Sequence, residues 1–170
     1  MAKLSQRFDS AVPAFIVWRD SFGVNNAELD DHHKRVLELV NQLYAAIRDG
    51  TAQKLVRPIL NELEESTPPH FRKEEDWMQR HQFPDLDRHK ALHRRLAREL
   101  NALQGRTSDG PVARGAELLR FLKSLWTNHI CGYDQQYASY ILRRSNQHGS
   151  HPGIPPVGPH LEVVTEVRAR

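Results

Sequence analysis

Cysteine is nearly absent from this sequence, in which Cys131 stands alone. A single cysteine excludes an internal disulfide and fits a reducing compartment, so we expect a cytoplasmic protein. The first residues lack the apolar segment of a secretory signal peptide. No apolar run approaches the roughly 20 residues that a membrane-spanning helix needs, so no membrane span is expected.

A concentrated charge of either sign is also missing. The formal net charge is +3, and basic and acidic residues are interspersed. No basic stripe with interleaved aromatic side chains is present, which argues against binding to nucleic acid. The 170 residues are enough for one domain with a sizeable core. The residue type in excess is histidine, with ten copies, and the positions of these histidines matter.

No alternating strand pattern competes with a helical period anywhere in the sequence. Asn25, followed by Glu28, predicts an N-cap and capping box for the first helix, and Asp49-Gly50 predicts its end. Four amphipathic helices are expected, over residues 27–48, 53–81, 85–105 and 111–144. With short connections between them, the sequence predicts an all-α, up-down-up-down antiparallel four-helix bundle with an N-terminal arm.

The second predicted helix contains Pro68-Pro69. Proline in a helix interior removes a backbone hydrogen bond and clashes with the preceding turn. We therefore expect a kink or a restart at this point, with Ser66 or Thr67 capping the second half.

Three parts are expected along the chain. Residues 1–24 form an arm that packs on the bundle, and residues 25–144 form the bundle itself. Residues 145–170, rich in proline, glycine and histidine, are expected to form a mobile tail without a core of its own.

Polar residues occupy several positions of the predicted inward-facing stripes. Each would cost roughly 1–3 kcal/mol if it were buried without a partner. Up-down topology brings these positions to one level of the bundle, where a cation would satisfy them together. The residues are His33, His70, Glu74, His89, His93 and His129.

Asp134 lies five residues after His129. In a regular α-helix this offset turns the two side chains about 140° apart. A π-bulge, or a long reach at a loosened turn, would bring both side chains to the core, and this is our hypothesis. Imidazole and carboxylate ligands suit Zn, Cu, Fe or Ni, and five histidines with two carboxylates suit two ions better than one tetrahedral zinc. The Glu-x-x-His motif of the usual di-iron bundle is absent.

Across about residues 18–140 the sequence resembles the hemerythrin family, specifically the bacterial hemerythrins. The motifs that carry the resemblance occur in the family's order. They are Trp18 with Gly23-Val24; Leu29-Asp30-Asp31-His32-His33-Lys34; His70-Phe71 with Glu74-Glu75 and Met78; His89 with His93; and His129-Ile130 with Asp134 and Tyr137.

The resemblance implies reversible O2 binding at a non-haem di-iron centre, as in an O2 carrier, store or sensor. By motif position, one iron is expected on His89, His93 and His129. The other is expected on His33 and His70, which leave it a vacant position. Besides O2, a redox or O2-consuming partner protein is a possible partner.

The resemblance also implies that Glu74 and Asp134 bridge the two irons, together with an oxide or hydroxide. His32 stands where the family usually has glutamine, and the stripe spacing favours His33 over His32 as the ligand. Two other functions stay open at this point. One is a di-iron enzyme that acts on O2, NO or peroxide, and the other is a metal-buffering or zinc-binding structural bundle.

Overall fold

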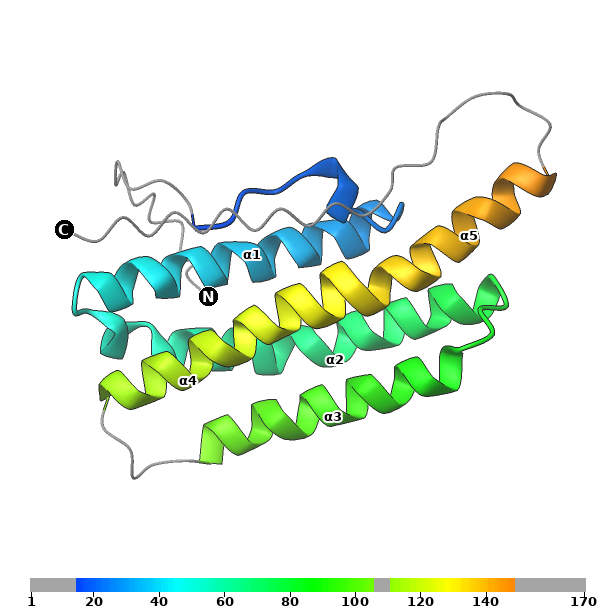
Figure 1. Cartoon of the computed structure of the whole chain (residues 1–170). Coiled ribbons are helices and arrows are strands. Elements are labelled where there is room, and N and C mark those ends of the chain that lie inside the picture. The colour runs from blue at the N-terminus through cyan, green and yellow to red at the C-terminus, as the bar shows by residue number, and fades with distance from the viewer. Residues whose placement is uncertain (1–14, 106–110, 149–170) are drawn as a thin grey trace.

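The computed structural model describes residues 15–105 and 111–148, and the regular structure in these ranges is entirely helical. Four helices pack antiparallel, as predicted (Figure 1). The fourth helix is continuous but is composed of two α-helical parts with a π-helical segment between them. The elements are α1 (Ala27–Arg48), α2 (Val56–Arg80), α3 (Leu86–Gly105), α4 (Pro111–Ser124), the π-helical segment (Leu125–Asp134) and α5 (Gln135–His148).

Helix α1 has the predicted bounds but a different cap. The side chain of Asn26 accepts hydrogen bonds from the backbone N–H groups of Glu28 and Leu29. Asn25, the predicted cap, instead has a φ of 59°, in the left-handed region that asparagine tolerates better than most residues. The prediction was wrong by one residue because either asparagine could cap the helix and the turn geometry selects between them.

Helix α2 runs unbroken through Pro68 and Pro69, so the predicted restart was wrong. The Ser66 hydroxyl donates to the carbonyl of Glu62 one turn back instead of capping a new helix. The two prolines leave the carbonyls of residues 64 and 65 without their helical donors. Both of these residues are exposed, so water can satisfy their carbonyls.

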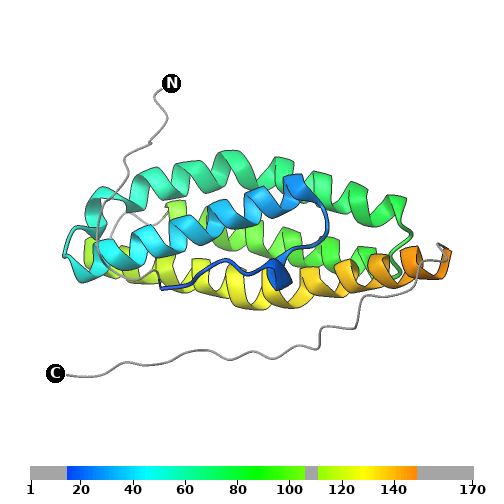
Figure 2. The same ribbon diagram turned by 90° about the horizontal axis from the view of Figure 1, so that it is seen from above.

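The described part of the arm, residues 15–24, lies along α1 and the fourth helix (Figure 2). The Asn41 side chain pairs with both the N–H and the carbonyl of Ile16. At the other end of the arm, the Asp30 carboxylate accepts a hydrogen bond of 2.7 Å from the Val24 N–H. Trp18 packs edge-on against Trp126 of the bundle, with 6.2 Å between the ring centroids.

The fourth helix continues to His148, four residues beyond its predicted end. Residues 145–148, which were predicted to belong to the tail, are therefore helical. The predictions for residues 149–170, and for residues 1–14 of the arm, fall outside the described part of the chain.

Two apolar clusters fill the bundle. The large apolar cluster, which includes Leu43, Leu60 and Leu122, extends toward the connection between α1 and α2. The small apolar cluster, which includes Leu29 and Met78, lies toward the connection between α2 and α3. No helix in the described ranges is long and apolar enough to cross a membrane.

Candidate metal centre

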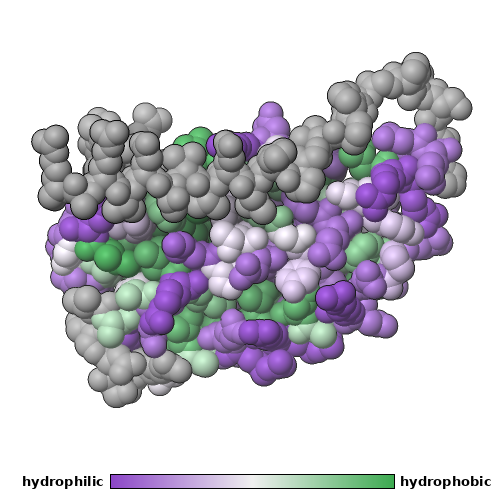
Figure 3. All heavy atoms as spheres, viewed as in Figure 1, coloured by the Kyte–Doolittle hydropathy of each residue, from purple (hydrophilic) through white to green (hydrophobic). Residues whose placement is uncertain are grey.

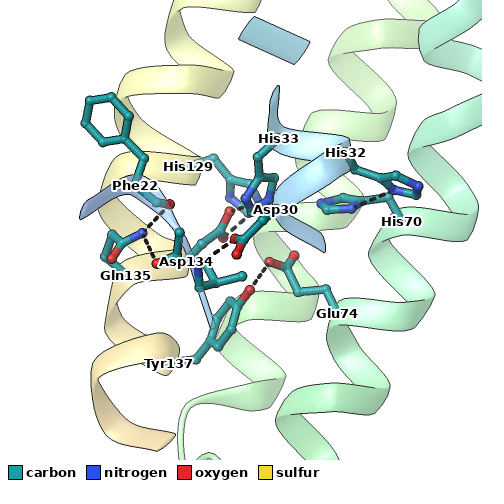
Figure 4. Close-up of polar contacts among 12 residues, drawn as sticks. Phe22, Asp30, His32, His33, His70, Glu74, His129, Asp134, Gln135 and Tyr137 are labelled. Carbon is teal, nitrogen blue, oxygen red and sulfur yellow. Dashed lines mark hydrogen bonds and ion pairs between the residues drawn. The ribbon is translucent and has the colours of Figure 1, made fainter. Parts of the chain in front are cut away.

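All seven predicted site residues lie together between the two apolar clusters, and we call them the polar layer. Figure 4 shows side chains from different helices converging in the interior of the bundle. His70 is half-buried, and the other six side chains are buried. The members are His33 on α1, His70 and Glu74 on α2, His89 and His93 on α3, and His129 and Asp134 in the π-helical segment.

One side of the polar layer gathers three histidines around one carboxylate. The Nε2 atom of His93 lies 3.1 Å from the Nε2 atoms of both His89 and His129. It also lies 2.9 Å from Oε2 of Glu74. Imidazole nitrogens that converge in this way, with a carboxylate oxygen among them, form a set of donors that a single metal ion can bridge.

The other side of the polar layer has two histidines. Ligand atoms of His33, His70 and Glu74 lie within 4.8 Å of one another. Glu74 thus belongs to both groups of potential ligands. Asp134 also faces both sides, because its Oδ2 is 3.5 Å from Nε2 of His33 and its Oδ1 is 3.4 Å from Nε2 of His129.

The π-helical segment makes this arrangement possible, and it confirms the predicted departure from α-helix. Hydrogen bonds from residue i to i+5 bring residues five apart toward the same face. As a result, His129 and Asp134 are both buried and both point into the polar layer. The hypothesis would have failed if Asp134 had faced solvent.

Several buried polar atoms of the polar layer have no hydrogen-bond partner. Both ring nitrogens of His33 and both carboxylate oxygens of Asp134 are in this state. Each such atom costs roughly 1–3 kcal/mol when nothing satisfies it. Bound cations would satisfy the atoms that face the centre, so the residues present fit a metal site.

Burial keeps three histidines of the polar layer, His33, His70 and His129, neutral. It lowers the pKa of His33 and that of His129 well below the usual value for histidine, since the charged form would lose its hydration. For the same reason the pKa of His70 falls to about 3. Neutral imidazole is the form that binds metal, so these side chains are ready to act as ligands at neutral pH.

The two carboxylates behave differently. Burial acts to raise the pKa of Glu74, but hydrogen bonds from His89 and His93 outweigh it and keep the pKa below its usual range. The pKa of Asp134 is raised by burial and by the neighbouring charge of Glu74. A second buried negative charge is therefore unfavourable in the protein alone, and a cation between the two carboxylates would relieve the repulsion.

Three contacts around the polar layer were not predicted from the sequence. The Tyr137 hydroxyl donates to Oε1 of Glu74 at 2.7 Å (Figure 4). Nδ1 of His93 lies 2.7 Å from Oε1 of Glu75, and Nδ1 of His70 lies 3.2 Å from Nδ1 of His32. Tyr137 and Glu75 were visible as motif residues, but their partners lie on other helices and could not be read from spacing along one helix.

Comparison with known proteins agrees with this geometry. Residues 24–141 match the profile of the hemerythrin HHE cation binding domain, and the chain therefore belongs to the hemerythrin family. A bacteriohemerythrin of Stenotrophomonas maltophilia is 29% identical over 135 residues, which cover 79% of this chain and 86% of that protein.

The matches to two further relatives cover nearly the whole length of those proteins. A bacteriohemerythrin of Methylococcus capsulatus is 30% identical over 73% of this chain and 95% of that protein. A hemerythrin-like protein of Naegleria gruberi is 30% identical over 78% of this chain and 98% of that protein. The buried histidines and carboxylates are therefore groups able to bind metal in a bundle of the hemerythrin type.

Proposed function

We propose that this protein binds O2 reversibly at a non-haem di-iron centre in the polar layer. In this proposal one iron is held by His89, His93 and His129. The other would be held by His33 and His70, and with fewer histidines it would leave room for O2. Glu74 and Asp134 bridge the two ions, together with an oxide or hydroxide.

The observation that carries the proposal is the sharing of both carboxylates between the two sides. Glu74 belongs to both groups of potential ligands, and the two oxygens of Asp134 face opposite sides. A site for one ion needs no shared carboxylates. Two adjacent cations need them, because bridging carboxylates offset the repulsion between the cations.

Iron ions bound in this way supply the electrons that an O2-binding site needs. The protein side chains determine the charge of the site and its access to water. Neutral imidazoles leave only the two carboxylates as anionic protein ligands, and the apolar clusters above and below the polar layer exclude water. A dry, weakly charged site disfavours the loss of charged reduced oxygen species, which supports reversible binding over turnover.

The proposal also includes a partner protein and a cellular compartment. Reversible binding needs the iron to be kept reduced, so a redox partner or an O2-consuming partner protein belongs to it. The single cysteine supports a reducing compartment such as the cytoplasm.

Iron content and the visible spectrum test the proposal together. The full chain is loaded with Fe²⁺ under nitrogen, dialysed, and then exposed to air. We expect close to two irons per chain, no colour in the reduced protein, and a visible band that appears with O2 and disappears on degassing. Immediate irreversible oxidation would point instead to an enzyme acting on O2, NO or peroxide, and a colourless zinc protein would contradict the proposal.

A further inference from the structure

The five histidines of the polar layer differ in what lies behind their rings. Nδ1 of His33 and Nδ1 of His129 are buried without a hydrogen-bond partner among the described residues. Nδ1 of His93 and Nδ1 of His70, in contrast, each face a polar side chain. One of these two histidines belongs to each side of the polar layer.

Behind His93 stands a carboxylate. When Nε2 of His93 binds a metal ion, Nδ1 carries the proton and donates it to Oε1 of Glu75, which lies 2.7 Å away. Phe71 stacks on the His93 ring at 3.8 Å between centroids and 6° between planes. The ring is thus fixed both in its plane and in its tautomer. A carboxylate behind a ligand histidine also makes the imidazole a stronger donor to metal.

Behind His70 stands another imidazole. The Nδ1 atoms of His32 and His70 are 3.2 Å apart, and one of them must donate to the other (Figure 4). If His70 gives Nε2 to a metal, its Nδ1–H donates and His32 accepts. In this arrangement an imidazole on the outer side of His70 supports the same tautomer without adding negative charge, and His32 is half-buried.

We propose that Glu75 and His32 are positioning residues that make the two metal sites unequal. The carboxylate of Glu75 strengthens the three-histidine site through His93. The neutral imidazole of His32 only orients His70, so the two-histidine site holds its metal more weakly. The proposal rests on the proposed di-iron function. It also predicts which of the two sites binds metal first and which residues determine that order.

The experiment is a Co²⁺ titration of the full metal-free chain. Calorimetry and visible absorption monitor the binding. Co²⁺ is chosen because it is stable in air and its absorption reports its ligands. We expect two binding steps of different affinity in the natural sequence. Failure to bind two ions would overturn the proposed function itself, and it would be seen before any variant is compared.

Variants at the two positions should then have opposite effects. H32L should weaken the second step by roughly 10-fold to 100-fold and leave the first within about twofold, because the lost partner serves only His70. E75L should weaken the first step by a similar factor and spare the second. H32Q and E75Q, which keep an acceptor oxygen, should recover much of the loss at their own step.

A control separates positioning from damage to the fold. His81 is also half-buried, and its Nδ1 is 2.8 Å from the carbonyl of Trp77, away from the polar layer. H81L should leave both binding steps unchanged. If H32L and E75L weaken both steps equally, or shift the thermal midpoint of the metal-free chain far more than H81L does, the residues support the fold and the inference is wrong.

A second readout needs no metal. Nitrogen NMR of the histidine side chains reports which ring nitrogen carries the proton. We expect the Nδ1–H tautomer for His70 in the natural sequence and a mixed tautomer for His70 in H32L. At His93, where Nε2 also faces Glu74 at 2.9 Å, E75L should lower the share of the Nδ1–H tautomer. Tautomers that do not respond to these variants would overturn the inference even if two ions bind.

Discussion

The large apolar cluster and the polar layer are built on the same helices but differ in completeness. On α1, Leu29, His33 and Leu37 are buried at successive turns, so an apolar residue lies one turn away on each side of the histidine. The leucines need no polar partner, because packing against other apolar side chains is enough to stabilise them. The polar layer leaves buried nitrogens and oxygens without partners, including all ring and carboxylate heteroatoms of His33 and Asp134.

This difference indicates that the two regions have separate tasks. The apolar clusters include residues from every helix, so we expect them to hold the bundle together without metal. The polar layer gains its full stability only with bound cations. Folding and metal binding should therefore respond to different substitutions, and the following experiments test that separation.

The largest effect is expected from Glu74→Ala. Glu74 belongs to both groups of potential ligands, so its loss should remove both metal ions rather than one. The metal-free variant should remain folded on its apolar clusters. Metal analysis after dialysis and far-ultraviolet circular dichroism check the two parts of this prediction. A variant that keeps two irons and an unchanged spectrum would contradict the proposed bridging role.

The matched substitution in the other region is Leu43→Ala. Leu43 is completely buried in the large apolar cluster, and its truncation should lower the free energy of unfolding by about 2–5 kcal/mol. Metal content should stay the same as in the natural sequence. Urea denaturation and metal analysis measure both, and a loss of metal would mean that the two regions are not separable.

Tyr137→Phe tests the boundary between the polar layer and the small apolar cluster. The ring stays in place, but Oε1 of Glu74 loses a buried donor at 2.7 Å, which should cost about 1–3 kcal/mol in the metal-free chain. Tyr140→Phe is the control, since its hydroxyl donates to the carbonyl of Gln82 and accepts from Arg144, away from the polar layer. Denaturation curves should separate the two variants, and equal curves would argue against a structural role for the Glu74 contact.

The pH dependence of the metal-free chain should have a definite sign. His33, His70 and His129 have lowered pKa values in the folded state, that of His70 being about 3, against about 6.5 when unfolded. Between these limits the unfolded chain binds more protons. The free energy of unfolding should therefore fall as the pH drops from 6.5 toward 3, by at most about 1.4 kcal/mol per pH unit for each histidine.

One group opposes this trend. Asp134 has a raised pKa, so its contribution favours the folded state at low pH and is lost as the pH rises through that pKa. The three histidines, together with Glu74, whose pKa is lowered, act against this one aspartate and leave a net loss of stability on acidification. Urea denaturation at several pH values measures it, and a His70→Phe variant should show a shallower slope. A flat profile in the natural sequence would contradict the neutral state of these histidines.

The sequence predicted most of the fold because the information is local. The bounds of α1 are those expected from its apolar period and its flanking asparagine and glycine residues. The placement of the site residues at one level followed from up-down topology, and the side chains do lie together. Their role as iron ligands remains a prediction.

The errors share one physical cause, which is that the deciding contact lies outside the local pattern. On α2, Phe71 and Met78 are buried, whereas Thr67 and Trp77, which a strict 3,4 spacing would also place inward, are not. A strict 3,4 spacing drifts from the 3.6-residue period of a real helix, and packing against neighbours decides which residues are covered. At Pro69, likewise, exposure of the freed carbonyls let the helix continue.

By itself the sequence determined the four helices, their order and the residue types that converge in the interior, because helical periodicity and caps act over a few residues. Only the tertiary structure decided the pairs across helices, such as His32 with His70 and Glu75 with His93. The π-helical segment lies between these cases. A five-residue spacing indicated it, but only the burial of both His129 and Asp134 against the other helices shows that the backbone adopts it.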